Sequence, residues 1–161
     1  MKTGKALPTL KYLSYLVVFI GLILGAAIPA RAGPPEIYTG AYEGVAINGY
    51  DPVAYFTENR PVEGSPDIVH EWKGVKWRFS SAENRDMFTA DPEKFAPQYG
   101  GYCAYAVSYG STATTDPSAF SIVDNKLYLN YSSGVKARWS KDIPGYISKA
   151  DANWPRILAG K

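Results

Sequence analysis

Only two side chains in this chain combine nucleophilic and soft-metal-binding chemistry: the single cysteine, Cys103, and the single histidine, His70. A thiolate can bind a soft metal, attack an electrophile or be oxidised, and a neutral imidazole offers a ring nitrogen as ligand or base. If the two meet and a Tyr or Asp supplies a third donor, the set suits copper better than zinc. Structural zinc takes four ligands at spacings such as Cys-x-x-Cys, which the chain does not contain.

Each of these residues also has a purely structural interpretation. Cysteine is among the most buried residue types and packs as a small hydrophobe, so Cys103 could belong to a core. His70 could be a core histidine whose ring nitrogens bond to backbone carbonyls or to a tyrosine. A lone cysteine in an exported chain is buried, paired with another chain or functional.

The N-terminus has the pattern of an export signal. Three lysines lie in the first eleven residues, residues 13–30 form a mostly apolar run without charge, and Ala30-Arg31-Ala32 is a small-x-small cleavage pattern. We therefore predict a signal peptide over residues 1–32 and a periplasmic or secreted protein. The alternative is an uncleaved N-terminal anchor, which would be the only membrane attachment that the sequence suggests.

The remaining chain is predicted to be a Pro/Gly-rich extended tether over 33–42 and one domain over 43–161. Four of the 17 basic residues and none of the 15 acidic ones precede residue 33, so 13 basic and 15 acidic residues remain. Binding to a phosphate backbone requires a dense basic patch, and the sequence has none, so we expect no nucleic-acid partner. A single cysteine allows no internal disulfide, and the domain must rely on packing.

Residues 68–79 have the pattern of a β-hairpin that turns at Lys73-Gly74, where glycine supplies the positive φ of a two-residue turn. One face is apolar except for His70. The predicted cross-strand pairs are Trp72 with Val75, His70 with Trp77, and Ile68 with Phe79. Ser80 is expected to cap the following helix, with Glu83 completing a capping box.

A second hairpin is predicted over 120–131, with its turn at Asp124-Asn125. It ends in Tyr131-Ser132-Ser133, which lies 52 residues after Phe79-Ser80-Ser81. Two such hairpins, each followed by a helix, would build one small antiparallel sheet with helices on one face. The expected fold class is therefore α+β, with a degenerate internal repeat as a suggestion.

The segment 99–109 between these units fits either a strand or a helix by its periodicity. The glycines at both ends and two internal alanines favour a helix that stops at Gly110. Cys103 would then lie in the first turn, where the helix dipole favours the thiolate.

Three parts of the chain resemble the YHS domain family: the stretch Tyr50–Phe56, the hairpin end Trp77–Ser81, and the Asp91-Pro92-Glu-Lys-Phe step. The resemblance implies a small α+β domain often linked to transition metals, and His70 matches the position of the family's namesake histidine. In cysteine-bearing members an Asp-Pro-Val-Cys-Gly-Met turn and a Phe-Cys-Ser-x-x-Cys corner hold a metal. Here those three cysteines are replaced by Ala54, Ser80 and Asn84.

Three functional hypotheses follow. The first is an exported accessory protein that binds a copper-type transition metal or a small ligand, with His70 and Cys103 as metal ligands. Its candidate ligand-binding residues are Asp51, Tyr55 and Tyr102, although Asp51 could instead only cap a helix. The second is a non-catalytic interaction module for an unidentified protein partner, without a cofactor. The third is a thiol-dependent enzyme in which His70 activates Cys103; no acid pair, phosphate loop or poised dyad supports catalysis, so we predict no enzyme.

Overall fold

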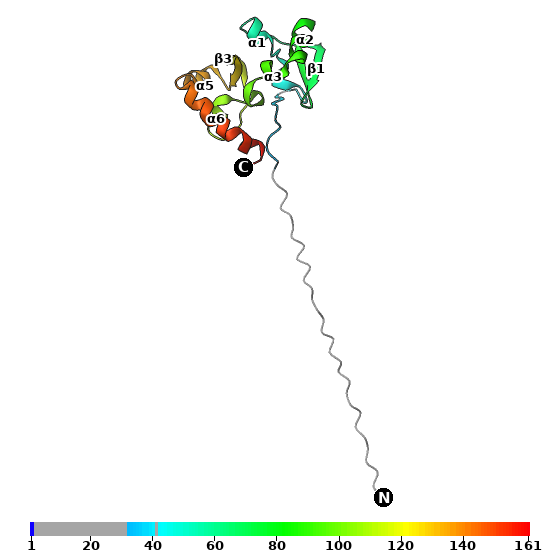
Figure 1. Ribbon diagram of the computed structural model, residues 1–161, viewed down its shortest axis with the longest axis vertical. Coiled ribbons are helices and arrows are strands. Elements are labelled where there is room, and N and C mark those ends of the chain that lie inside the picture. Colours follow the sequence, from blue (N-terminus) through cyan, green and yellow to red (C-terminus); the bar gives the residue numbers. More distant parts are fainter. Residues whose placement is uncertain (2–31, 41) are drawn as a thin grey trace.

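The computed structural model describes residue 1, residues 32–40 and residues 42–161. The predicted signal peptide or anchor lies almost entirely outside the described residues. The rest of the chain folds into two halves that lie side by side (Figure 1). The first half contains η1 (Ala46–Gly49), α1 (Ala54–Thr57), β1 (Ser65–Trp72), β2 (Val75–Phe79), α2 (Ala82–Ala90) and α3 (Pro92–Phe95). The second half contains η2 (Gln98–Gly101), α4 (Ala104–Ser108), β3 (Asp116–Val123), β4 (Lys126–Asn130), α5 (Ser133–Trp139) and α6 (Ile143–Leu158).

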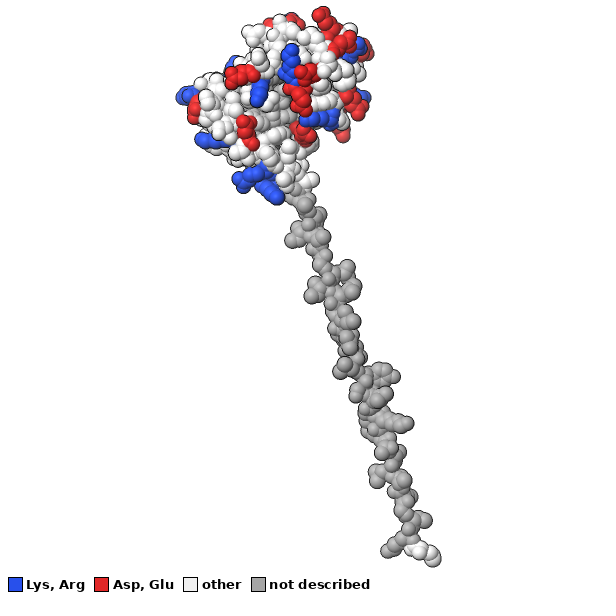
Figure 2. All heavy atoms as spheres, in the orientation of Figure 1, with Lys and Arg blue, Asp and Glu red and all other residues white. Residues whose placement is uncertain are grey.

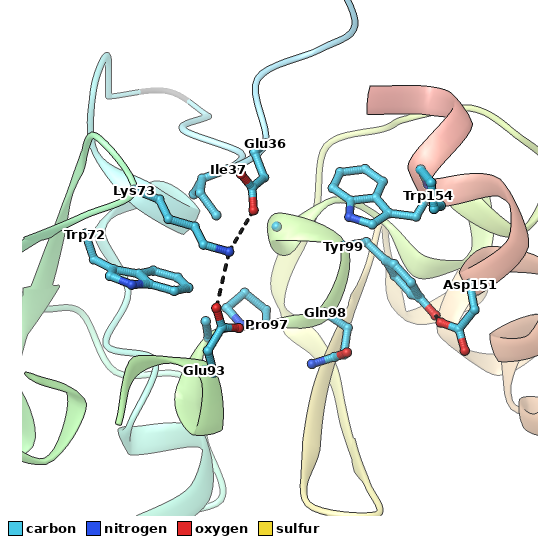
Figure 3. Close-up of a pocket in the computed structure, with 13 residues that line it drawn as sticks. Glu36, Ile37, Trp72, Lys73, Glu93, Pro97, Gln98, Tyr99, Asp151 and Trp154 are labelled. Atoms are coloured by element: carbon cyan, nitrogen blue, oxygen red, sulfur yellow. Dashed lines mark hydrogen bonds and ion pairs between the residues drawn. The ribbon is translucent and has the colours of Figure 1, made fainter. Parts of the chain in front are cut away.

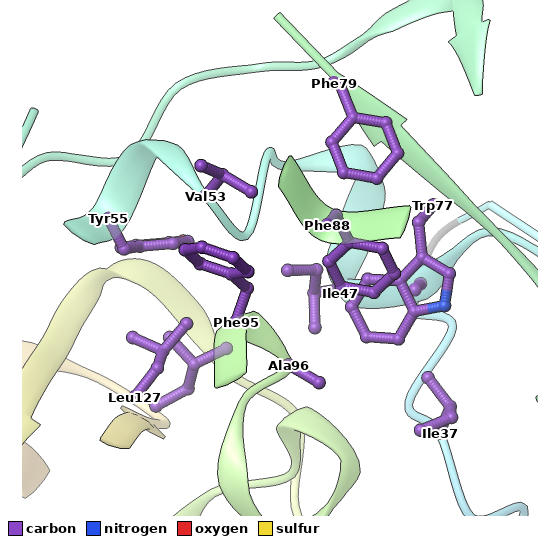
Figure 4. Packing of buried hydrophobic residues seen from close by; sticks show 12 residues of the cluster. Ile37, Ile47, Val53, Tyr55, Trp77, Phe79, Phe88, Phe95, Ala96 and Leu127 are labelled. Atoms are coloured by element: carbon purple, nitrogen blue, oxygen red, sulfur yellow. The ribbon is translucent and has the colours of Figure 1, made fainter. Parts of the chain in front are cut away.

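The α+β class is confirmed, but the two hairpins do not share one sheet. β1 pairs with β2 and β3 pairs with β4, each pair forming its own antiparallel sheet. Instead of pairing at their edges, the hairpins direct apolar side chains into one common cluster, to which β2 contributes Trp77 and Phe79 and β4 contributes Leu127 and Leu129 (Figure 4). Burying these large apolar side chains in one cluster removes their surface from water and stabilises the contact between the two hairpins.

The two halves repeat the same order of elements: a 3₁₀ turn, a short helix, a hairpin and a helix. The equivalence extends to local geometry, because both ladders have an irregularity after their first pair, between Ser65 and Val69 and between Asp116 and Phe120. The helix N-caps are Ser81 and Ser132, so the hairpins and helices correspond at an offset of 51 residues. The predicted offset of 52 is one residue too long for the hairpins and helices. It matched Ser81 with Ser133, whereas the residue that caps the second helix is Ser132.

The register of the first hairpin is confirmed near its turn and wrong at its open end. Trp72 pairs with Val75 and His70 with Trp77, as predicted, but Phe79 pairs with Ser65 rather than with Ile68. Pro66 has no backbone N–H, so the ladder cannot run through it regularly. The next amide, that of Asp67, instead donates to Ser65 Oγ at 3.2 Å.

Two local predictions about helices had different outcomes. The segment after Gly101 is a helix, α4, with Cys103 as its N-cap residue, so the helical interpretation is confirmed. The capping role given to Ser80 is wrong: Ser81 Oγ accepts from the Asn84 amide at 3.1 Å, and the Ser80 hydroxyl donates to Asp51 instead.

Strand β4 is buried on both faces. Leu127 and Leu129 point into the cluster shared with the first half. Tyr128 points the other way, into a second cluster with Trp139 of α5 and Ala150 of α6. Because successive side chains of a strand alternate, one short strand joins both cores.

The first half is also tied to the second through Tyr55. Its hydroxyl donates to the Pro117 carbonyl at 3.2 Å, and its ring meets Phe120 edge-on at 4.9 Å. Burial raises the pKa of Tyr55 above its usual value, with smaller contributions from Tyr50 and the nearby aspartates.

The segment predicted to be a tether packs on the domain over its described residues. Ile37 is buried, and the Tyr38 amide donates to the Gly100 carbonyl at 2.9 Å. Gly100 has a φ of +62°, and a Cβ there would lie 1.7 Å from the Glu36 carbonyl oxygen, so glycine is required. None of the helices in the described part of the chain has the length and apolarity to cross a membrane.

The raised pKa of Tyr55 predicts a specific alkaline sensitivity. A raised pKa in the folded state means that the stabilisation is complete below the ordinary pKa of 10.0 and is lost as pH rises above it. Tyr55→Phe should cost about 1 kcal/mol at pH 7 through the lost hydrogen bond. The difference in the free energy of unfolding between wild type and Tyr55→Phe should become smaller above pH 10, by up to about 1.4 kcal/mol per pH unit. Urea unfolding from pH 7 to 11 measures this difference, and a pH-independent difference would contradict the assignment.

Candidate functional site

The positions that the resemblance predicts to match the metal-binding cysteines are linked here by a buried carboxylate. Asp51 is 0% exposed. Its Oδ1 accepts from the amides of Val53 at 2.8 Å and Ala54 at 3.3 Å. Its Oδ2 accepts from the Ser80 amide at 2.8 Å, the Ser80 hydroxyl at 2.7 Å and Asn84 Nδ2 at 2.7 Å. Five donors thus converge on one side chain and join the turn before α1 to the corner between β2 and α2.

This arrangement does not fit a soft metal ion. Ser80 and Asn84 present hydrogen atoms to Asp51 rather than lone pairs to a central ion, and Ala54 offers no side-chain donor. A soft metal prefers thiolate or thioether ligands. Asp51 therefore acts as a structural acceptor that holds together the corner where the resemblance would place a metal.

Cys103 occupies the equivalent position in the second half. Both positions follow three consecutive residues with positive φ, Ile47–Gly49 before Asp51 and Tyr99–Gly101 before Cys103. Cys103 Sγ accepts from the Tyr131 amide at 3.3 Å, as Asp51 accepts from the amide of Ser80.

The thiol of Cys103 is also enclosed. It is 1% exposed, and it contacts Asn130 Oδ1 at 3.7 Å. That same oxygen accepts from the Tyr105 amide at 3.2 Å, which completes the second junction. The thiol is thus built into the fold as the counterpart of the Asp51 carboxylate.

His70 lies in a different environment from Cys103. It is half-buried on β1, and its ring meets Phe88 of α2 edge-on at 6.2 Å. Among the described residues no hydrogen bond or ring contact joins His70 to Cys103, and no group of three or more His, Cys, Asp or Glu side chains is placed to hold a metal ion. The shared Cys–His site stays a prediction that these surroundings do not support.

The other two candidate ligand-binding residues, Tyr55 and Tyr102, are also buried. Tyr55 is 1% exposed and links the halves, as described above. Tyr102 is 8% exposed, and its hydroxyl donates to the Pro35 carbonyl at 3.0 Å, so it holds the N-terminal segment in place. Burial raises the pKa of Tyr102. Asp51, Tyr55 and Tyr102 are therefore engaged within the chain.

A cleft of about 260 Å³ lies at the seam between the two halves. Figure 3 shows Trp72 and Lys73 of the first hairpin on one side and Tyr99, Asp151 and Trp154 on the other. Glu36 from the N-terminal segment and Glu93 from α3 also line the cleft, together with Gln98.

An ammonium group already lies between aromatic and acidic side chains in this cleft. Lys73 Nζ lies 2.7 Å from Glu36 Oε1, 3.3 Å from Glu93 Oε1 and 4.5 Å from the centroid of the Trp72 ring. Partial burial by itself lowers the pKa of Lys73, but the hydrogen bond and charge of Glu36, with those of Glu93, outweigh it and raise the pKa. Lys73 therefore stays charged at neutral pH.

The opposite wall is also fixed by hydrogen bonding. Tyr99 donates to Asp151 Oδ1 at 2.8 Å, and its ring contacts Trp154 edge-on at 6.1 Å. Burial and this hydrogen bond raise the pKa of Tyr99, which keeps the phenol protonated and donating. Three carboxylates against one ammonium leave the cleft with a surplus of negative charge.

Sequence reasoning missed this cleft because its residues come from segments far apart in the chain. The signals present were the high aromatic content and the Trp72-Lys73 pair beside a turn, and neither identifies a site without the fold. Comparison of the chain with family models, with curated proteins and with solved structures finds no match. The likeness to the YHS domain family therefore stays a prediction.

The Asp51 junction yields a stability prediction. Asp51→Ala should lower the free energy of unfolding by about 3 kcal/mol or more, because it leaves buried donors on Ser80 and Asn84 without an acceptor. Asp91→Ala is the matched control: Asp91 caps α3 at the surface, accepting from the Lys94 amide at 3.3 Å, and its loss should cost about 1 kcal/mol. Urea unfolding compares the two, and equal losses would argue against a central role for Asp51.

Burial of Cys103 predicts low thiol reactivity. In the folded protein, modification by a thiol-specific disulfide reagent at pH 7.5 should be roughly a hundredfold slower than in 6–8 M urea, because access requires local opening. The absorbance of the released reagent follows the reaction. Equally fast modification in both conditions would show an accessible thiol and would revive the hypothesis of a thiol-dependent enzyme.

Proposed function

We propose that this protein is an exported, non-catalytic binding protein that holds a small organic cation in the cleft between its two halves. The observation that carries the proposal is the position of the Lys73 ammonium, between Glu36 and Glu93 and over the face of Trp72. Carboxylates combined with aromatic faces are the surroundings that organic ammonium groups prefer. The cleft therefore contains, within the protein, the kind of contact that such a ligand would make.

The remaining lining supports the same ligand class. Trp154 borders the cleft from α6, and Asp151 keeps one carboxylate oxygen free of the bond from Tyr99. Gln98 adds an amide beside them. A cleft of about 260 Å³ lies just below the usual range of about 300–1,000 Å³ for drug-sized ligands, so the ligand is small.

A binding role fits the state of the chemically active groups better than an enzymatic role. The Cys103 thiol is buried against Asn130, and Asp51 is saturated by five donors. His70 is held against Phe88 rather than facing a nucleophile. None of these three residues lines the cleft. Export itself rests on the N-terminal sequence pattern.

Titration with tetramethylammonium chloride tests the proposal. Two-dimensional ¹⁵N NMR follows the indole signals, which Trp72 and Trp154 of the cleft and the buried Trp77 and Trp139 provide. The signals of Trp72 and Trp154 should shift in a saturable manner, and that of Trp139, outside the cleft, should stay in place. Trp77, whose indole N–H donates to the Trp72 carbonyl at 3.2 Å, should follow Trp72 with a smaller shift. Sodium chloride at equal ionic strength is the control for charge screening.

Charge variants connect the binding to the cleft. Glu93→Gln should weaken tetramethylammonium binding by about three- to tenfold, the effect expected of one carboxylate near an organic cation. Glu83→Gln, an equally conservative change in the first turn of α2 and outside the cleft, should leave the affinity unchanged. Uniform shifts of all four indoles, or equal effects of both variants, would rule out the cleft as the site.

A further inference from the structure

A surface outside the cleft combines basic and aromatic side chains. Its residues are Tyr105, Tyr109, Tyr146, Lys149, Arg156 and Lys161, and we call it the basic–tyrosine face. On α6, residues 146, 149 and 156 follow one another at spacings that place them on one side of the helix. Asp151, by contrast, lines the cleft, so α6 separates the two surfaces.

The three tyrosines form one contiguous cluster on the surface. The ring centroid of Tyr105 lies 5.1 Å from those of both Tyr109 and Tyr146, and Tyr109 and Tyr146 are 6.3 Å apart. Tyr109 is 64% exposed, so the cluster presents aromatic surface to solvent. Lys149 Nζ lies 5.8 Å from the centroid of the Tyr146 ring, so charge and aromatic surface adjoin.

Charge divides sharply between the two halves. Residues 33–103 contain 6 basic and 11 acidic residues, a net charge of −5, whereas residues 104–161 contain 7 basic and 4 acidic residues, a net charge of +3. Figure 2 shows acidic side chains concentrated over the half that carries β1 and α2. In the described part of the chain, every ion pair involves a basic residue of the first half, so the cations of the basic–tyrosine face are unpaired.

The chain enters the folded part beside this face. Ala32 and Gly33 share a surface hollow with Gly110 and Lys161. An adjoining hollow is lined by Tyr109, Arg156 and Lys161. Figure 2 shows a group of basic side chains at the lower end of the folded part.

From these observations we propose that the basic–tyrosine face docks on an anionic phospholipid surface. Lysine and arginine side chains near such a surface are attracted to the headgroups. Tyrosine, with an apolar ring and a polar hydroxyl, is suited to the boundary between headgroups and acyl chains. Ala32 and Gly33, which follow the uncharged apolar run over 13–30 in the sequence, lie at this face. A membrane is therefore the anionic partner that the position of the face favours, and the acidic half with its cleft would point away from the lipid.

Partitioning of the purified protein into vesicles tests the proposal. Vesicles of phosphatidylcholine alone and vesicles with 30% phosphatidylglycerol are sedimented with the protein at 50 mM and 500 mM sodium chloride. Where the segment before Ala32 is retained, its Lys2, Lys5, Lys11 and Arg31 also favour anionic vesicles, so the paired variants below, which leave this segment unchanged, separate its contribution from that of the face. We expect a partition coefficient at least about tenfold higher on the anionic vesicles at low salt, and a loss of that excess at high salt.

Paired variants assign this excess to the face. Lys149→Gln combined with Arg156→Gln should reduce the excess by about tenfold or more. Lys76→Gln combined with Lys126→Gln removes two exposed basic residues from strand ends outside the face and should have little effect. Unchanged indole NMR signals show that both double variants are folded.

Two outcomes would overturn the proposal. One is equal partitioning on neutral and anionic vesicles, and the other is an equal effect of the two double variants. Polyglutamate serves as the competing anionic probe: tight binding to it without any excess on anionic vesicles would identify an acidic protein, rather than a lipid surface, as the partner of the face.

Discussion

The burial of β4 on both faces is the constraint on which the rest of the structure depends. Leu127 and Leu129 close the cluster shared with the first hairpin, and Tyr128 closes the cluster under α5 and α6. A strand that is packed on both sides cannot shift its register without exposing both sets of side chains. The relative orientation of the two halves is therefore fixed. The contacts of Tyr55 with Pro117 and Phe120 reinforce it. Because the relative orientation of the two halves is fixed, the cleft at the seam is preformed rather than assembled around a ligand.

The two halves of the repeat use different side chains, a carboxylate and a thiol, to join the turn before the short helix to the end of the hairpin. After three residues of positive φ, one half places Asp51 under the start of its helix and the other places Cys103 there. The carboxylate gathers five donors, whereas the thiol accepts one amide and shares its role with Asn130. A buried polar group is tolerated when its hydrogen bonds are complete, and the Asp51 junction follows that rule. At the Cys103 junction Asn130 Oδ1 is engaged, but Asn130 Nδ2 is buried without a partner among the described residues. The residues with the most versatile chemistry are thus part of the framework, and binding falls to surfaces made by other residues.

Helix α6 separates two surfaces of opposite character. Asp151 and Trp154 border the acidic, aromatic cleft, whereas Lys149 and Arg156 belong to the basic–tyrosine face. An organic cation is attracted to the first surface and a phospholipid headgroup to the second. The two proposals are compatible in one molecule, because a face lying on a membrane would leave the cleft open to solvent and to its ligand.

The sequence by itself determined the elements whose causes are local. Lys73-Gly74 and Asp124-Asn125 mark the two turns, alternating apolar residues mark the strands, and the glycines around 100–110 mark α4; the α+β class follows from these. Only the tertiary structure decided where the elements meet. Whether Ser80 or Ser81 caps α2 depends on Asp51, 29 residues earlier, and the cleft joins Glu36, Lys73 and Asp151 from three distant segments. The physical reason is that β4 carries apolar side chains on both faces, so its sequence shows that it is buried but not which partner covers each face.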